Sequence, residues 1–243
     1  MKFLDHYTDR ILFYAQNPHL LQWRKYHSDP KAYKTYQYTW LQKFCFKTIL
    51  DIGANEGQAA ILFRQAFRQA TIHSFEPLPD CFTKLKQTAA KLGHVTPYNT
   101  ALGTTSGTIQ FERNLYSPSS SILAVNKTHQ ENFPQTSGTV SVEVCIQRLD
   151  EVMADIPVDG PMLVKLDVQG YERQVIEGGT ETLSRADVVI AETSMEPLYD
   201  GQPLFLDIVN SLKELGFRYA GSMDQLYSPK DGRVLQQDAF FVR

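Results

Sequence analysis

Two charged side chains interrupt the apolar run MLVKLDVQGYE, which covers residues 162–172. Lys165 and Asp167 stand two positions apart in it, and side chains at that spacing lie on the same side of a strand. A charge in a strand that is buried on both faces costs free energy unless it is paired with another charge or serves the function of the site. Asp167, at the carboxyl end of the strand, is the leading candidate for a base or for an anchor of a substrate hydroxyl. Lys165 would hold that carboxylate ionised, or stabilise an oxygen as it loses its proton.

A structural ion pair that fixes a strand–helix turn is the alternative interpretation of the same two residues, because ion pairs also cluster at such turns. Histidine is the usual base in proteins, and His129 is a third catalytic candidate from its position near a serine-rich loop. We expect four further polar side chains to meet the substrate or to complete a polar network: Ser120, Gln169, Glu172 and Glu192.

A glycine loop follows the first apolar run, in LDIGANEG at residues 50–57. The dinucleotide pattern G-x-G-x-x-G fails here, because Asn55 and Gln58 occupy its second and third glycine positions. Gly53 would let the backbone turn tightly and approach a ligand. A pyrophosphate favours a helix N-terminus without acids, whereas Asp51 and Glu56 flank this loop. The loop therefore suits a ligand with a positive group better than a phosphate, and a nicotinamide-dependent enzyme is disfavoured.

An acid ends the second apolar run, in FEP, about 25 positions after Asp51. A carboxylate at that place can bind both hydroxyls of a ribose. A ribose-bearing cofactor with a cationic end and no phosphate is S-adenosylmethionine, so Glu76 is assigned to its ribose. The alternative is that the glycines only form turns and that Glu76 is a solvated strand end.

Strands and helices alternate from residue 48 onward, which predicts an α/β fold with a mostly parallel, doubly wound sheet. The predicted strands cover residues 48–53, 71–77, 95–103, 162–168, 187–194, 217–222 and 238–243, the last two as an antiparallel pair. The predicted helices cover residues 56–67, 79–93, 171–179 and 203–216. Ligands of such sheets bind at the carboxyl ends of the strands, which are residues 53–57, 76–77, 99–103, 167–172 and 192–194.

Two segments are additions to this alternating core, and substrate recognition is expected from them. Residues 104–147 contain two alternating, β-branched stretches that predict an inserted β-hairpin or small sheet. Residues 1–46 predict an N-terminal helical cap of two or three short helices. Its rings could stack on sugars, form the core of the cap, or contact a second copy in a homodimer; they are Trp23, Tyr26, Tyr33, Tyr36, Tyr38 and Trp40.

The chain resembles the FkbM family of S-adenosylmethionine-dependent methyltransferases from about residue 48 to residue 243. The segments that carry the resemblance occur in this order: ILDIGANEGQ, FEP, NTALG, SSSIL, LVKLDVQGYERQVIEGG and AETS. The resemblance implies a class I methyltransferase (Rossmann-like) domain over residues 47–243, with a seven-stranded sheet and one antiparallel strand. It also implies O-methylation of a hydroxyl on a sugar, glycan or natural product.

The resemblance also assigns residues to the cofactor by position. Asp51, Gly53, Asn55 and Gly57 would line the methionine part, Glu76 would hold the ribose, Asn99 and Ala101 would lie near the adenine, and Lys165 and Asp167 would sit beside the transferred methyl. Ala54 and Pro77 belong to the same strand-end turns and are counted with them. Position 169 is Gln where many members have Glu, so a charge on that side chain is not expected to be essential.

Composition limits the partners and the compartment. The net charge of −3, without a dense Lys/Arg stripe, argues against nucleic acid or an anionic membrane as a partner. Three distant cysteines indicate neither a disulfide framework nor a zinc site. The acids Asp167 and Glu192 could hold Mg²⁺, but carboxylates alone do not specify it, and no metal is expected. The start MKFLDHYTDR has no apolar signal region, and no run reaches the ~18 apolar residues of a membrane span. A cytoplasmic protein is therefore expected.

Two other functions stay open. An N-methyltransferase on protein or nucleic acid is disfavoured, because DVQGYE stands where enzymes on base amines are expected to carry [DN]-P-P-[YF]. A non-catalytic S-adenosylmethionine-binding module is disfavoured by the intact pair of Lys165 and Asp167.

Overall fold

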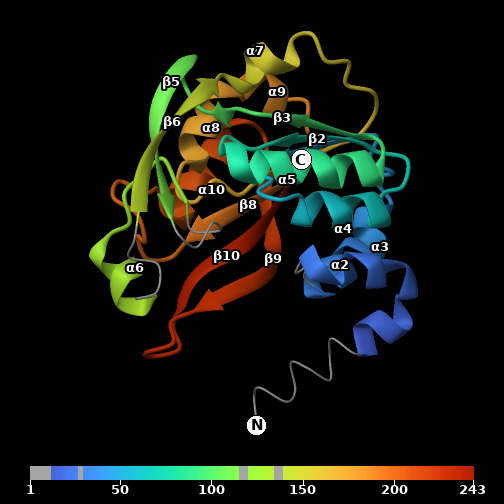
Figure 1. The fold of residues 1–243 in the computed structure, drawn as a ribbon, viewed down its shortest axis with the longest axis horizontal. Helices are drawn as coiled ribbons and strands as arrows, with labels where there is room; N and C mark the ends of the chain where they lie inside the picture. The colour runs from blue at the N-terminus through green and yellow to red at the C-terminus, as the bar shows by residue number, and fades with distance from the viewer. Residues whose placement is uncertain (1–11, 27–29, 115–119, 134–138) are drawn as a thin grey trace.

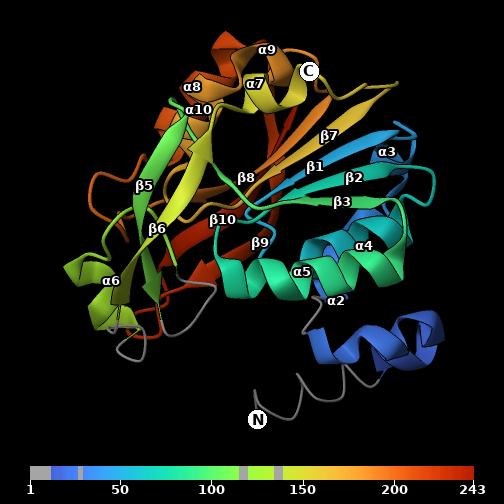
Figure 2. The same ribbon diagram turned by 45° about the horizontal axis from the view of Figure 1, so that its top comes forward.

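The computed structural model describes residues 12–26, 30–114, 120–133 and 139–243. Its fold (Figure 1) contains a seven-stranded sheet in the order β3-β2-β1-β7-β8-β10-β9, whose strands are all labelled in Figure 2. The strands are β1 Thr48–Ile52, β2 Thr71–Phe75, β3 Val95–Tyr98, β7 Met162–Leu166, β8 Val188–Ser194, β9 Arg218–Tyr227 and β10 Val234–Val242. β10 runs antiparallel to both of its neighbours, β8 and β9, and the other pairs are parallel. The predicted sheet with one antiparallel strand is confirmed.

Helices cover both faces of this sheet (Figure 2). α4 Gln58–Ala66 and α5 Pro79–Leu92 lie on one face, and α8 Glu172–Gly178 and α10 Phe205–Glu214 lie on the other. Strands covered on both sides are mostly apolar, and every residue of β1 and β7 is buried, Asp51 and Lys165 included. α5 begins with a proline at its first position, where the missing N–H removes no helical bond. These helices match the four that the sequence predicts.

The strand order reverses between β1 and β7. The chain moves outward from β1 to β2 and β3 and then returns to place β7 on the other side of β1. Ligands of doubly wound sheets bind at the carboxyl ends of the strands beside such a reversal. The register also pairs Asp51 of β1 with Lys165 of β7. The two strands that carry charged candidate residues are therefore neighbours in the sheet.

The N-terminal segment forms short helices that pack on the sheet's α4 face: η1 Pro18–Tyr26, α2 Pro30–Tyr36 and α3 Thr39–Gln42. The Tyr36 ring lies 4.9 Å from the Phe63 ring of α4, and the Trp40 ring lies 5.2 Å from the Phe240 ring of β10, between centroids. Trp23, Tyr33 and Tyr36 are buried, whereas Tyr38 and Trp40 are partly exposed. The described aromatic side chains of this segment thus contribute mainly to the core; the Tyr26 side chain lies outside the described residues.

A second, three-stranded sheet of β4 Ala101–Leu102, β5 Gly107–Asn114 and β6 Thr139–Gln147 stands beside the main one (Figure 2). β5 and β6 form the predicted hairpin. The single strand expected over residues 95–103 is wrong: β3 ends at Tyr98, and β4 pairs with β6 instead. The Asn99 amide nitrogen donates to the carbonyls of Glu76 and Pro77, at 2.9 Å each, and turns the chain away from β3.

Three further short helices were not predicted: α6 Lys127–Asn132, α7 Leu149–Met153 and α9 Thr180–Leu183. Each has one or two turns, which is too short for an apolar periodicity to be recognised. Of the helices in the described ranges, none is long and apolar enough to cross a bilayer.

Candidate active site

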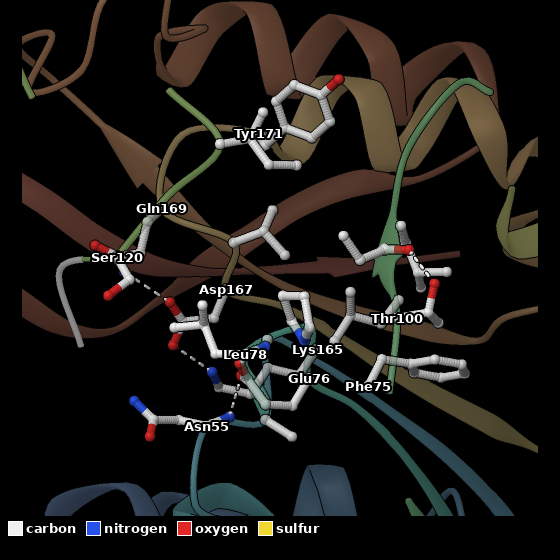
Figure 3. A pocket seen from close by; sticks show the side chains of 18 of the residues that line it. Asn55, Phe75, Glu76, Leu78, Thr100, Ser120, Lys165, Asp167, Gln169 and Tyr171 are labelled. Carbon is white, nitrogen blue, oxygen red and sulfur yellow. Dashed lines mark hydrogen bonds and ion pairs between the residues drawn. The ribbon is translucent and has the colours of Figure 1, made fainter. Parts of the chain in front are cut away.

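A cavity of about 440 Å³ opens at the carboxyl ends of β1, β2, β7 and β8 (Figure 3). Phe111 and Ile122 from the inserted region, residues 104–147, close one side of it. Eleven of the candidate residues line the cavity: Gly53, Ala54, Asn55, Glu76, Pro77, Ala101, Ser120, Lys165, Asp167, Gln169 and Glu192. The place expected from the strand alternation therefore holds a pocket, and most of the candidate side chains face it.

Five candidates lie outside the lining of this pocket: Asp51, Gly57, Asn99, His129 and Glu172. Asp51 is completely buried behind the glycine loop and accepts a hydrogen bond from Ser74 Oγ at 3.3 Å. Burial raises the pKa of the Asp51 carboxyl to about 6, although the Lys165 ammonium opposes the rise. Gly57 begins α4 with a φ of 95° and packs on Thr88, where a Cβ would come within 2.9 Å. These residues support the pocket from behind.

Close backbone contact joins the glycine loop, residues 53–57, to the turn after β7, residues 167–172. Gly53 has a φ of 84°, and a Cβ there would lie 1.8 Å from the Asp167 carbonyl oxygen. Only glycine combines that conformation with that approach. Asn55 and Gln169 also have left-handed φ values, of 48° and 54°, which side chains other than glycine rarely adopt. The tight pair of turns aims both side chains at the pocket.

The Glu76 carboxylate is held at the pocket's edge by two backbone groups. Its Oε2 accepts from the Asn55 N–H at 2.9 Å, and its Oε1 accepts from the Leu78 N–H at 2.8 Å. Burial raises its pKa to about 7, against the lowering effect of these two hydrogen bonds. Each carboxylate oxygen can accept more than one hydrogen bond, so Glu76 can still accept from two hydroxyls of a ligand.

Lys165 and Asp167 form the ion pair that their spacing predicts. Lys165 Nζ lies 2.6 Å from Asp167 Oδ2, and Gln169 Nε2 donates to Asp167 Oδ1 at 2.9 Å. Burial by itself would raise the pKa of Asp167, but the Lys165 charge and these hydrogen bonds hold it below its usual range. Burial would likewise lower the pKa of Lys165, but Asp167, Asp238 and Asp51 raise it. Both groups therefore stay charged near neutral pH.

Gln169 connects this pair to two other residues. Its Nε2 also donates to Glu192 Oε2 at 2.8 Å, and its Oε1 accepts from the Tyr199 hydroxyl at 2.8 Å. Burial, together with the charges of Asp167, Glu172 and Asp238, raises the pKa of Glu192 well above its ordinary value. Tyr199 was not predicted, because no motif marks it and only the fold brings it to Gln169.

Glu172 closes the turn after β7 and does not face the pocket. Its Oε1 accepts from the N–H groups of Val168 at 3.0 Å and Gly170 at 3.2 Å. Burial raises its pKa to about 7, against these backbone hydrogen bonds. The expectation of a substrate contact is replaced by a supporting role, since the turn wraps its own backbone around this carboxyl group.

The inserted region is tied to the same turn. Ser121 Oγ donates to the Gln169 carbonyl at 2.6 Å. Ser120, which lines the pocket, accepts from the Asn114 N–H at 3.0 Å. The serine-rich segment thus fixes the position of the insertion over the pocket as well as contributing to its lining.

His129 lies outside the pocket, contrary to the expectation that it reaches the reaction centre. It is buried in α6, where its ring packs against Phe133 and Tyr199 with centroids 5.5 and 5.3 Å away. Its two ring nitrogens have no hydrogen-bond partner in the part of the chain that the structure describes, and burial lowers its pKa. Tyr199, and not His129, makes the hydrogen bond to the network at the pocket.

The pocket fits a ligand that carries no phosphate. Its volume is in the range of sites for small ligands. Among the described lining residues Lys165 is the sole cation, and Asp167 engages it. Apolar side chains of Phe75, Leu78, Leu102 and Phe111 supply a face suited to a ring system. Within the described residues, no group of three His, Cys, Asp or Glu side chains is arranged to hold a metal ion.

Comparison with known proteins identifies the family. The model of the Methyltransferase FkbM domain matches residues 51–219. The chain belongs to the FkbM methyltransferase family. This FkbM methyltransferase is 31% identical to the 2-O-methyltransferase NoeI of Sinorhizobium fredii over an alignment of 176 positions that covers 68% of this chain and 72% of that protein. It is 32% identical to the hexuronic acid methyltransferase AglP of Haloferax volcanii over 143 residues, 58% of this chain and 54% of that protein.

A solved structure shares the fold. The FkbM methyltransferase from Methylobacillus flagellatus matches with a TM-score of 0.52 and 12% identity, over 86% of this chain and 47% of that chain. The resemblance inferred from the motifs is confirmed, and the chain is a methyltransferase enzyme with the class I fold.

Proposed function

We propose that this FkbM methyltransferase transfers a methyl group from S-adenosylmethionine to a hydroxyl of a sugar or glycan. One observation carries the proposal: a single pocket brings together Glu76 at the end of β2 and the hydrogen-bonded network of Lys165, Asp167, Gln169 and Glu192. The first element suits a ribose, and the second suits a hydroxyl that must lose a proton.

The residues present fit the cofactor. Glu76 would bind the ribose hydroxyls, the turn of Gly53, Ala54 and Asn55 would hold the methionine part, and Pro77 and Ala101 would flank the adenine. Asp51, Gly57 and Asn99 would act from behind by fixing these turns. S-adenosylmethionine supplies a methyl group on a positively charged sulfur, for which a neutral thioether is the leaving group. An acid-rich pocket without a free cation among its described lining residues favours such a charge.

The acceptor side of the site would be formed by Asp167, Gln169 and Ser120. A neutral alcohol is a weak nucleophile, so its oxygen must be aligned and relieved of its proton as the new bond forms. We assign Asp167 as the anchor of the acceptor hydroxyl and Lys165 as the charge that keeps this anchor ionised. The names of NoeI and AglP, which specify a 2-O-methyltransferase and a hexuronic acid methyltransferase, support a sugar-like acceptor.

Methylation of a glycoside panel tests this function. The purified protein is incubated with S-adenosylmethionine carrying a ¹³C-labelled methyl group, together with neutral glycosides, uronic acid glycosides and polyketide-type alcohols. We expect mass spectrometry to detect the gain of one labelled methyl on a glycoside, and NMR to locate it on an ether oxygen. A methyl group found on nitrogen, or tight cofactor binding without transfer to any member of the panel, would overturn the proposal.

A control variant separates binding from folding. Glu76→Gln keeps the shape of the side chain but removes the charge next to the ribose. We expect calorimetry to show a loss of cofactor affinity of about 10-fold or more, as expected for a charged hydrogen-bonding partner. Glu181→Gln, an exposed glutamate on α9, should leave the affinity unchanged.

A further inference from the structure

The two carboxyl groups that face the acceptor side differ in how their oxygens are engaged. Both oxygens of Asp167 are occupied, Oδ2 by the Lys165 ammonium and Oδ1 by the Gln169 amide. In Glu192 only Oε2 has a hydrogen-bond partner among the described residues, and that partner is again the Gln169 amide. A carboxylate that already receives an ammonium and an amide hydrogen bond is a poor proton acceptor.

We propose that Glu192 takes the proton of the acceptor hydroxyl and that Gln169 is the positioning residue that aims it. This inference rests on the proposed function and assigns its proton-transfer step. Glu192 lines the same pocket as Asp167, and one nitrogen, Gln169 Nε2, lies 2.9 Å from the Asp167 carboxylate and 2.8 Å from the Glu192 carboxylate. An alcohol anchored on Asp167 is therefore next to the second carboxyl group.

The acceptor oxygen forms a bond to the methyl carbon while the bond between that carbon and the sulfonium breaks, and its electron pair stays on sulfur. The hydroxyl proton moves to Glu192 and converts a carboxylate into a carboxylic acid. Proton release to bulk water then restores the enzyme. Asp167 remains an anion throughout, since Lys165 stays beside it.

The charges around Glu192 make its carboxylate a stronger proton acceptor than that of an ordinary glutamate. The groups that act on it come from each element packed against it: Asp167 and Lys165 at the end of β7, Glu172 of α8, Asp238 of β10 and Tyr199 after β8. Burial and the three carboxylates raise the pKa of Glu192, and Lys165 partly opposes them. Because the pKa is raised, Glu192 is protonated in acid, and the rate should increase with pH through that pKa.

The orientation of Gln169 is fixed by its other contacts. The Tyr199 hydroxyl donates to Gln169 Oε1, so the amide nitrogen must point to the two carboxylates. The left-handed backbone at Gln169, with a φ of 54°, and the Ser121 hydrogen bond to its carbonyl hold the side chain in this direction. Gln169→Glu would remove both N–H donors and add a negative charge beside Glu192.

Comparison of two carboxyl-to-amide variants is the decisive experiment. In Glu192→Gln, we expect kcat to decrease roughly 10²- to 10⁴-fold, as for other lost general bases, with cofactor affinity within a few-fold. In Asp167→Asn, we expect the KM for the acceptor to rise and the pH profile to persist with its midpoint at lower pH, because a neighbouring negative charge is gone. Glu181→Gln is the matched control and should behave as the wild type. Retention of kcat within a few-fold in Glu192→Gln would overturn the assignment.

Direct titration gives a second result that needs no acceptor. The glutamate side-chain carboxyl carbons are labelled with ¹³C, and the Glu192 signal is identified by its loss in Glu192→Gln. In the cofactor-free protein we expect it to titrate well above the ~4.3 of an unperturbed glutamate, and still higher in Gln169→Glu. Titration at or below the ordinary value would overturn the inference. If the wild type methylated no glycoside, the proposed function would fail, and this titration would still decide the state of Glu192.

Discussion

Two turns meet at the pocket, and they are built differently. The turn after β1, residues 53–57, is shaped by glycines and backbone hydrogen bonds, since the N–H groups of Gly53 and Ala54 both donate to the Phe75 carbonyl. The turn after β7, residues 167–172, is shaped by charged side chains and the amide of Gln169. A site that binds a constant ligand can be fixed by backbone, whereas a site that moves a proton needs titratable groups. Under the proposed function, the first turn would bind the cofactor and the second would face the acceptor.

Gly53→Ala should produce the largest effect, because it damages the point where both turns touch. The added Cβ would meet the Asp167 carbonyl oxygen at 1.8 Å, and the backbone would also be strained at its positive φ. We expect the free energy of unfolding to decrease by about 3 kcal/mol or more, the sum of a clash and of backbone strain. Cofactor binding, followed by calorimetry, should be lost together with methyl transfer.

Gly232→Ala is the matched control. Gly232 has a comparable φ of 77°, but no heavy atom lies within 4 Å of the Cβ that would be added. We expect a decrease of only about 1 kcal/mol in urea unfolding, from backbone strain alone, with unchanged cofactor affinity. Equal losses in both variants would show that the contact between the turns is unimportant.

Lys165→Met should disrupt the charged turn after β7 and leave the glycine turn after β1 intact. The change leaves the Asp167 carboxylate buried without its countercharge, so the pKa of Asp167 should rise and the fold should lose about 2 kcal/mol, less than a fully buried pair because Asp167 is partly exposed. Methyl transfer should be lost, while cofactor affinity decreases less than 10-fold because Glu76 and its hydrogen bonds remain. Urea unfolding and calorimetry measure the two effects separately.

Lys230→Met provides the comparison for this variant. Lys230 pairs with Glu131 at the surface, at 3.0 Å, with both side chains about half exposed. Exposed ion pairs contribute only about 0–1 kcal/mol. Cofactor affinity that decreased as strongly in Lys165→Met as in Gly53→Ala would contradict the division of labour between the turns.

The buried carboxyls should make the cofactor-free fold less stable as the pH rises. Burial raises the pKa of Asp51 to about 6 and the pKa values of Glu76 and Glu172 to about 7. These groups bind protons in the native state that the unfolded chain has already lost, so each removes up to about 1.4 kcal/mol of stability per pH unit between its two pKa values. Stability should therefore decline between about pH 4.5 and 7. Glu172→Gln should make that decline shallower in urea unfolding at each pH, and an unchanged slope would contradict the raised pKa of Glu172.

The apolar strands and the pocket's position could be predicted from sequence because they follow from local rules. β1 and β7 are mostly apolar, as a strand covered on both faces requires, with Asp51 and Lys165 as the charged exceptions. The two-residue period brings Lys165 to Asp167. Glu76 could be placed because it ends a strand next to the glycine loop.

Tyr199 and the position of His129 could not be predicted, since α6 and the segment after β8 meet only through tertiary packing. β3 ends early because the Asn99 amide caps the carbonyls of Glu76 and Pro77, a contact invisible to periodicity.

Ser121→Ala should produce the smallest effect, because it changes one link between the inserted region and the acceptor turn. Ser121 Oγ donates to the Gln169 carbonyl at 2.6 Å and accepts from the Leu123 N–H at 3.0 Å. Loss of these hydrogen bonds should lower the free energy of unfolding by about 1 kcal/mol. Since Gln169 is proposed to position the Glu192 carboxylate on the acceptor side, KM for the acceptor should rise a few-fold while cofactor affinity stays constant.

Ser141→Ala, at an exposed position of β6, is the control and should change neither the acceptor KM nor the cofactor affinity. An equal loss of cofactor affinity in Ser121→Ala would mean that the insertion supports both turns alike, and the contrast between a backbone-built and a side-chain-built half would then have to be abandoned.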